Sequence, residues 1–109
     1  MKTSVTLSIL VPVYNEQYLV RPSLERLKLL ADSPLLERIE VIVVDDGSTD
    51  RTNEVLRDFE SSEATHTNTK LEWIFVNHEA NQGKAAAIRT ALQRTSAELR
   101  RRWRQAGRR

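Results

Sequence analysis

The chain of 109 residues contains no cysteine and only three glycines, three prolines and six aromatic side chains. The lack of cysteine excludes disulfides, thiolate metal sites and cysteine nucleophiles. The glycines, at positions 47, 83 and 107, form neither a G-x-G-x-x-G motif nor a P-loop, which excludes the common glycine-rich phosphate cradles. Threonine and serine interrupt the apolar residues near the N-terminus, so the sequence there predicts neither a signal peptide nor a membrane span. We therefore expect a cytoplasmic protein, at most peripheral at the inner face of the membrane.

Charge is distributed unevenly, although the net charge is only +2. Residues 94–109 carry seven arginines and one acid, a net charge of +6, which leaves −4 for residues 1–93. The length suits one domain rather than two. We predict a folded half-domain over residues 1–93 and an Arg-rich helical tail over residues 94–109.

Three short apolar stretches rich in β-branched residues predict strands, and each is followed by a helical pattern. The strands are expected at Leu7–Val13, Ile39–Val44 and Leu71–Val76. Helices are expected at 17–31, after the turn residues 45–50, and from Lys84 onward, with a polar loop at 61–69. This β-α-β-α-β-α order predicts an α/β fold with a three-layer, Rossmann-like parallel sheet.

The third predicted helix carries an apolar seam with helical spacing that runs into the Arg-rich segment. Its members are Ile88, Leu92, Thr95, Leu99 and Trp103. Basic amphipathic helices of this kind can lie on an anionic membrane. Packing of the helix start on the sheet, with solvated arginines, is the simpler explanation.

Ligands of parallel α/β sheets bind at the carboxyl ends of the strands, where three polar segments are expected to meet. These segments are 14–16, 45–48 and 77–83. Asp45 and Asp46 could accept hydrogen bonds from a base or ribose, hold a divalent cation, or cap the following helix. We expect one acid to cap and the other to be available.

For other residues at this edge of the sheet, the sequence gives weaker evidence of ligand binding. Gly83 and Lys84 at a helix start could face an anion, or could be an ordinary turn and a solvated lysine. Tyr14 could stack on a base, or could cap the core. We expect His66 and His78 to be solvated loop residues.

Three motifs stand together at this edge: SILVPVYNE at 8–16, VIVVDDGSTDRT at 41–52 and NQGKAAAIRTAL at 81–92. In this order and spacing the chain resembles the N-terminal part of the family-two inverting glycosyltransferases with the GT-A fold. Within that family it looks most like the branch that transfers sugars to polyprenyl or dolichyl phosphate. The resemblance implies the nucleotide-binding half of a GT-A fold and a nucleotide-diphosphate sugar as donor.

The resemblance also implies roles for individual residues. Pro12 and Tyr14 match positions beside the base, and Glu16 matches a position near the nucleotide. Asp45 matches the acid that reads the base edge, and Asp46 its neighbour that supports the loop. Three further residues match the family segment that approaches the donor from the other side. They are Asn81, Gly83 and Lys84.

Family members continue into an Asp-x-Asp motif that binds Mg²⁺ or Mn²⁺, and this sequence contains no Asp-x-Asp. We therefore assign no metal ligand and no catalytic residue, and expect a truncated glycosyltransferase that is inactive alone. The acceptor implied is a lipid phosphate or a glycan. The alternative is a non-catalytic nucleotide-binding module whose basic helix touches an anionic membrane or nucleic acid.

The resemblance and the predicted sheet also suggest what the protein binds. We expect a nucleotide sugar as partner and no nucleic acid in the family-like function. In the family the first strand lies inside the sheet, so here its edge would be open. We expect self-association through that edge, or masking of the edge by the C-terminal helix.

Overall fold

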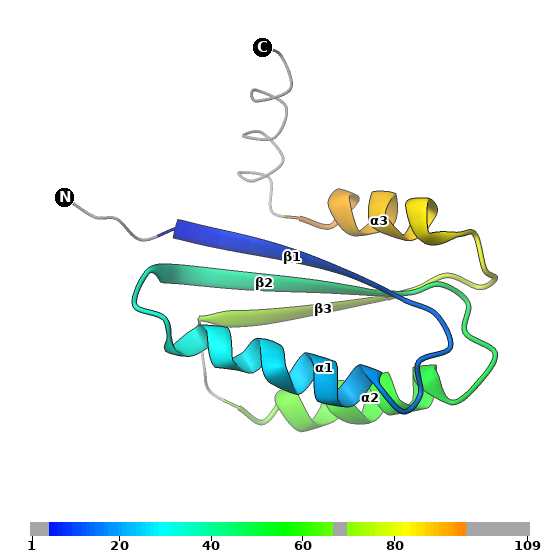
Figure 1. Cartoon of the computed structure of the whole chain (residues 1–109), viewed down its shortest axis with the longest axis horizontal. Coiled ribbons are helices and arrows are strands. Elements are labelled where there is room, and N and C mark those ends of the chain that lie inside the picture. The colour runs from blue at the N-terminus through cyan, green and yellow to red at the C-terminus, as the bar shows by residue number, and fades with distance from the viewer. Residues whose placement is uncertain (1–4, 67–69, 96–109) are drawn as a thin grey trace, which may run out of the picture.

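A computed structural model describes residues 5–66 and 70–95 of the chain. Strands and helices alternate along it in the expected order (Figure 1). The elements are β1 (Val5–Val13), α1 (Val20–Leu27), the 3₁₀ helix η1 (Lys28–Asp32), β2 (Leu36–Asp45), α2 (Thr52–Glu63), β3 (Leu71–Asn77) and α3 (Lys84–Gln93). The predicted α/β class and the alternation of its elements are confirmed.

The three strands form one parallel sheet in the order β1-β2-β3. In its register Val13 pairs with Asp45 and Asp45 pairs with Asn77, so the three carboxyl ends lie level. The central strand β2 is buried from Ile39 to Asp45. In the described part of the chain β1 is an edge strand, which suits Pro12 because proline lacks an N–H for a sheet ladder.

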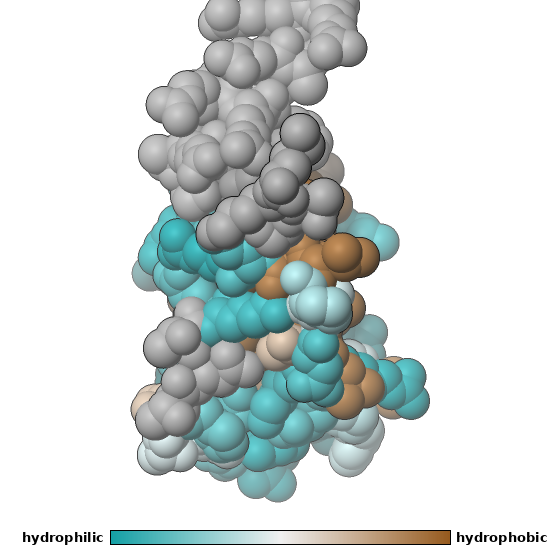
Figure 2. Space-filling view, turned by 90° about the vertical axis from the view of Figure 1, so that its left-hand side faces the viewer, coloured by the Kyte–Doolittle hydropathy of each residue, from teal (hydrophilic) through white to brown (hydrophobic). Residues whose placement is uncertain are grey.

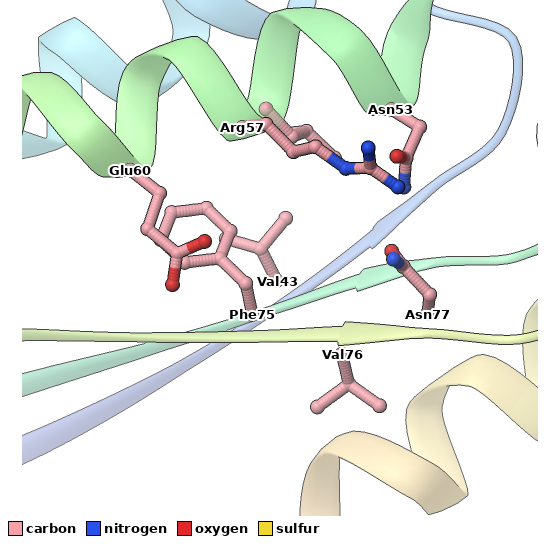
Figure 3. A pocket seen from close by; sticks show the side chains of 8 residues that line it. Val43, Asn53, Arg57, Glu60, Phe75, Val76 and Asn77 are labelled. Atoms are coloured by element: carbon pink, nitrogen blue, oxygen red, sulfur yellow. The ribbon is translucent and has the colours of Figure 1, made fainter.

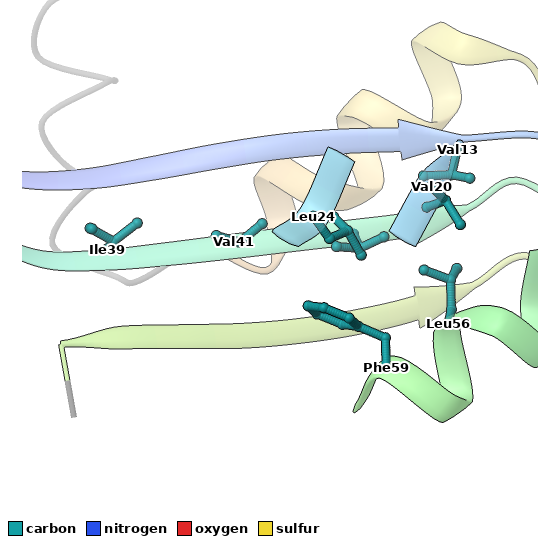
Figure 4. Close-up of a cluster of buried hydrophobic side chains, with 8 residues drawn as sticks. Val13, Val20, Leu24, Ile39, Val41, Leu56 and Phe59 are labelled. Atoms are coloured by element: carbon teal, nitrogen blue, oxygen red, sulfur yellow. The ribbon is translucent and has the colours of Figure 1, made fainter. Parts of the chain in front are cut away.

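Helices α1 and α2 cover one face of the sheet and α3 covers the other, which gives the expected three layers (Figure 1). The two cores follow from alternation along β2, because successive side chains point to opposite faces. Figure 4 shows the larger core, in which Leu24 and Phe59 pack against Val41. In the smaller core Ile42 and Val44 pack against Ala87 and Ala91 of α3.

Aromatic side chains extend the larger core along β3. The ring centroids of Phe59 and Trp73 lie 4.9 Å apart in an edge-to-face arrangement, and those of Trp73 and Phe75 lie 6.2 Å apart. The guanidinium of Arg21 lies 5.6 Å from the ring centroid of Phe59. These contacts join α2 to β3 and α1 to α2.

Several element boundaries differ from the expected ones; β1 begins at Val5 and β2 at Leu36, each earlier than expected. The first α-helix begins at Val20 instead of residue 17, because Leu19 and Val20 both donate to the carbonyl of Glu16 in a turn. The second helix continues through Glu63, whereas residues 61–63 were predicted to be loop. The Glu63 carboxylate binds the ammonium of Lys28 at 3.0 Å, which stabilises this last turn against η1.

Figure 2 views the end of the molecule where the strands begin, and among the described residues visible there hydrophilic ones predominate, with a hydrophobic patch beside them. Val5 and Leu35, which are both exposed, are joined there by a backbone hydrogen bond of 2.9 Å. The continuation of the third helical seam to Leu99 and Trp103, and most of the predicted Arg-rich tail, lie outside the described residues. The assignment of residues 94–109 as a helical tail stays a prediction.

Candidate functional site

Three loops meet at the carboxyl ends of the strands, on the right of Figure 1. They follow β1, β2 and β3, and they are joined to one another by side-chain and backbone hydrogen bonds. The expectation that segments 14–16, 45–48 and 77–83 share one edge of the sheet is therefore met by their contacts.

Asn15 holds the first loop to the second. It has a left-handed backbone with φ 51°, a conformation that asparagine tolerates better than most residues. Its Oδ1 accepts hydrogen bonds from the backbone N–H of Thr49 at 2.9 Å and of Asp50 at 3.3 Å. In return, the Oγ of Ser48 accepts from the backbone N–H of Asn15 at 2.9 Å. The two loops thus form a reciprocal clasp.

Thr52, fully buried at the start of α2, extends this clasp by one residue. Its Oγ1 accepts from the backbone N–H of Glu16 at 2.8 Å and donates to the carboxylate of Asp50. The same Asp50 oxygen accepts from the Thr52 backbone N–H. Asp50 is therefore the acid that satisfies a donor at the start of α2, and the expectation that Asp45 or Asp46 caps this helix is wrong.

Asp45 is 2% exposed and its carboxylate faces its own loop. Oδ1 accepts from the backbone N–H of Ser48 at 3.1 Å, and Oδ2 accepts from the side-chain amide of Asn53 at 3.2 Å. Both oxygens keep further lone pairs, because an ionised carboxylate has about four acceptor positions. Asp45 thus shapes the turn after β2.

Asp46 is 3% exposed and joins the second loop to the third. Its Oδ1 accepts from the backbone N–H of Gln82 at 2.9 Å, and its Oδ2 from that of Gly83 at 2.9 Å. The hydrogen bond from Gln82, together with the one from the His78 side chain, lowers the pKa of Asp46 below its ordinary value. Asp46 is therefore an anion whose hydrogen bonds join the second loop to the third.

The sequence prediction for His78 was wrong, since its side chain is only 8% exposed. Its Nδ1 lies 2.8 Å from Oδ1 of Asp46 and its Nε2 lies 2.8 Å from Oγ1 of Thr90 on α3. No signal in its own segment could reveal this, because both partners are distant in sequence. His66, by contrast, is exposed as expected.

An open hollow of about 290 Å³ lies at this edge of the sheet. Seven of the eight residues that the resemblance singled out line it, together with Val13 and Ala87: Pro12, Tyr14, Glu16, Asp46, Asn81, Gly83 and Lys84. Asp45 is the exception and lies outside the lining. The hollow approaches the size of small-molecule sites, which begin at about 300 Å³.

The lining includes exposed side chains that are available to a ligand, among them Tyr14, Glu16 and Lys84. Tyr14, which is 44% exposed, presents its ring to solvent instead of capping the core. Lys84 is exposed at the first position of α3. The backbone N–H of Gly83 is already bound to Asp46, so the charged side chain of Lys84, and not that amide, is the group able to meet an anion.

A second hollow lies between α2 and β3 and is too small for a nucleotide. Its volume of about 30 Å³ is roughly that of one water molecule. Figure 3 shows Asn53, Arg57 and Glu60 reaching from α2 toward Phe75 and Asn77 of the sheet. The hollow that segments of all three strand ends line is therefore preferred to this one as the candidate ligand site.

The described residues do not offer the donor set of a metal centre. Among residues 5–66 and 70–95 no group of three His, Asp or Glu side chains could hold an ion. Asp46, the one acid in the hollow besides Glu16, is occupied by N–H donors. In the same part of the chain no helix has both the length and the hydropathy that crossing a bilayer requires.

The chain is similar in sequence to enzymes that transfer sugars. It is 34% identical over 92 residues to an undecaprenyl-phosphate 4-deoxy-4-formamido-L-arabinose transferase of Aeromonas hydrophila, a match that covers 84% of this chain and 26% of the relative. The chain thus spans about a quarter of the length of that relative.

Solved structures agree with the sequence match. A mannosyltransferase of Pyrobaculum calidifontis, determined in complex with GDP-Man and Mn²⁺, superposes with a TM-score of 0.66 at 29% identity, covering 84% of this chain and 24% of that one. TarS of S. aureus superposes with a TM-score of 0.59 at 28% identity, covering 84% and 25%. The family model described as glycosyl transferase family 2 matches residues 8–99. The chain therefore belongs to glycosyl transferase family 2, as its N-terminal motifs and its parallel sheet indicate.

Proposed function

We propose that the hollow binds the nucleotide of a nucleotide-diphosphate sugar, as the donor half of a glycosyltransferase. The observation that carries this proposal is that seven residues from three separate segments of the chain line one open hollow at the carboxyl ends of the strands. This is the edge at which parallel α/β sheets bind their ligands. Membership of the family supports a sugar nucleotide over other ligands of that size.

Each available side chain has a role in the proposal. The exposed ring of Tyr14 offers a face on which a base can stack, beside Pro12. Glu16 lines the same hollow, and its carboxylate accepts hydrogen bonds from the hydroxyl groups of the ribose. The ammonium of Lys84 pairs with the diphosphate, because it is the cation of the lining.

Asp45 is proposed to accept hydrogen bonds from the edge of the base, which requires its carboxylate to become accessible. Its carboxylate is 2% exposed and lies outside the lining, so an oxygen becomes accessible only when the turn 45–48 shifts. Such a shift costs the hydrogen bond from Ser48 or the one from Asn53. Asp46, in contrast, keeps its supporting role in the bound state.

We assign no catalytic step to this chain by itself. Departure of a diphosphate builds negative charge, which a metal ion stabilises when an enzyme holds one at that position. The 109 residues contain no Asp-x-Asp, and the described acids do not form a metal site. We propose that these residues bind the donor and that transfer requires groups they do not supply.

The acceptor is proposed to be a lipid phosphate or a glycan. The relative of Aeromonas hydrophila is named for transfer to undecaprenyl phosphate, which supports the lipid phosphate. Contact with an anionic membrane surface follows from such an acceptor. Vesicle co-sedimentation at low and high salt measures it, and binding that salt does not weaken would contradict the electrostatic form of the contact.

Self-association through the edge of β1 remains a separate proposal. In the described residues β1 pairs only with β2, and unpaired strand edges tend to bind other strands. Sedimentation equilibrium over a range of concentrations tests it. A monomer throughout that range would contradict the proposal.

A nucleotide titration tests the function. Amide signals of residues 12–16 and 81–84 should shift on addition of UDP or GDP, with the same dissociation constant with and without Mn²⁺. Asp45→Ala should abolish the preference between the two nucleotides, whereas Asp58→Ala, which removes an exposed acid of α2, should leave it unchanged. The absence of any shift with either nucleotide would overturn the proposed function.

A further inference from the structure

His78 connects α3 to the loop that lines the hollow. Its backbone N–H donates to the carbonyl of Asp45 at 2.8 Å, so the residue continues the pairing of β3 with β2 by one position. Its ring lies between the carboxylate of Asp46 and the hydroxyl of Thr90, with 8% of the side chain exposed. Both ring nitrogens thus have partners at 2.8 Å.

The partners determine which nitrogen of the ring donates. The Asp46 carboxylate, ionised because its pKa is lowered, can only accept. Nδ1 therefore carries a proton and donates it to Oδ1 of Asp46. In the neutral ring Nε2 is then an acceptor, and the hydroxyl of Thr90 donates to it. Thr90 thereby favours the tautomer that Asp46 requires.

Asp46 connects His78 by hydrogen bonds to residues that line, or lie next to, the hollow. Oδ1 accepts from both His78 and Gln82, and Oδ2 accepts from Gly83, which immediately precedes Lys84. A buried carboxylate with three N–H donors has one orientation. Without His78 the Oδ1 atom keeps only the Gln82 amide among these contacts, and the carboxylate can turn away from the loop.

We propose that His78 is a positioning residue of the nucleotide site: its Nδ1–H fixes the Asp46 carboxylate, which in turn holds Gln82 and Gly83 and so places Lys84 at the hollow. This proposal rests on the proposed function, because it assigns a ligand to the hollow. It adds a residue outside the three sequence motifs, and outside the lining, to the determinants of donor affinity.

Two amide substitutions separate this role from a general contribution to packing. In His78→Asn the side-chain NH₂ lies near the position of Nδ1 and can still donate to Asp46. In His78→Gln the NH₂ reaches instead toward the position of Nε2, so the Asp46 donor is lost. Both variants are neutral and polar, and each keeps a polar group at only one of the two ring-nitrogen positions, Asn beside Asp46 and Gln beside Thr90, which makes each a control for the other.

The experiment measures binding of UDP and GDP to the full chain, together with the backbone amide signals of Gln82 and Gly83. Loss of a hydrogen bond to a charged group should weaken binding by about tenfold in His78→Gln. The two amide signals should move upfield in the same variant. His78→Asn should keep both amide positions and stay within about threefold of the parent affinity.

Equal affinities and equal amide signals in His78→Gln and the parent would overturn the proposal, and so would equal losses in both variants. If the parent chain binds neither nucleotide, the proposed function fails, while the amide signals still show whether His78 orders residues 82 and 83. Should His78→Gln fail to fold, Thr90→Val replaces it. That variant removes the donor to Nε2, and unchanged affinity with unchanged amide signals would then overturn the proposal.

Discussion

Gly47 and Ala80 touch backbone to backbone across the candidate site. A Cβ on Gly47 would lie 2.4 Å from the carbonyl carbon of Ala80 and 2.4 Å from the backbone nitrogen of Asn81. Gly47 also has φ +70°, a conformation that side chains disfavour. The second and third loops can therefore approach this closely only because position 47 has no side chain.

Gly47→Ala should destabilise the fold strongly. The left-handed backbone and the collision with Ala80 together predict a loss of about 2–5 kcal/mol in the free energy of unfolding. Urea unfolding followed by circular dichroism measures this loss. Gly83→Ala is the matched control, because Gly83 has φ +99° but open space where its Cβ would be. It should lose only the conformational part, about 1–2 kcal/mol, and an equal loss in both variants would contradict the contact argument.

Asn15 allows its backbone conformation and its hydrogen bonds to be tested separately. Asn15→Ala should lose about 1–2 kcal/mol of stability, because it removes the acceptor for Thr49 and Asp50 and strains the left-handed backbone. Asn15→Gly should lose less, since it removes the acceptor but relieves the backbone. Asn15→Asp keeps the acceptor and should resemble the parent. Thermal unfolding measures the order of stability of the three variants. A lower stability for Asn15→Gly than for Asn15→Ala would contradict the prediction.

Asp46 should make stability depend on pH in the acid range. Its pKa is lowered in the folded state, chiefly by the Gln82 amide and then by His78. The folded state therefore binds the proton less readily than the unfolded state, and the stabilisation is complete above the ordinary Asp pKa of about 3.9. As pH falls through the lower folded value, that stabilisation should be lost.

The measurement compares the parent with Asp46→Asn by urea unfolding at several pH values. The parent's advantage should be largest near neutral pH and should shrink below about pH 4. Asp58→Asn controls for removing one negative charge from the exposed face of α2. An advantage that stays constant down to the acid end would show that the Asp46 carboxylate is not preferentially ionised in the fold.

Lys84 should distinguish the phosphates of a nucleotide from its base. Lys84→Gln should weaken UDP binding by about threefold to tenfold at low salt and leave the weaker binding of uridine unchanged. Arg89→Gln removes the same charge from an exposed position farther along α3 and should alter neither affinity. Isothermal titration at two salt concentrations measures these effects. Equal losses for UDP and uridine would remove Lys84 from the phosphate position.

The order of strands and helices was predictable because the sequence patterns are strong. Ile39–Val44 is apolar except for Glu40, which is close to what a strand covered on both faces requires, and β2 is indeed buried between two helical layers. Element ends were less predictable. Residues 61–63 look like loop by composition, yet the contact of Glu63 with Lys28 extends α2 through them.

The lining of the hollow was also predictable in large part, because carboxyl ends of parallel strands meet at one edge. The sequence did not predict which of the two acids, Asp45 or Asp46, lines the hollow. Asp45 ends β2 and its carboxylate bonds Asn53 at the start of α2, whereas Asp46, the first residue after the strand, bonds Gly83 just before α3. Spacing alone cannot say which of two adjacent acids faces the ligand side.

The sequence by itself determined the parallel α/β architecture and the family, since these depend on local periodicity and on motifs whose order is fixed along the chain. Only the tertiary structure decided the hydrogen bonds of the site. His78 has its partners at Asp46 and Thr90, and Asn15 has its partners at Ser48, Thr49 and Asp50. Those contacts form only when the sheet brings distant loops together, because hydrogen bonds require a separation of about 3 Å that no local pattern encodes.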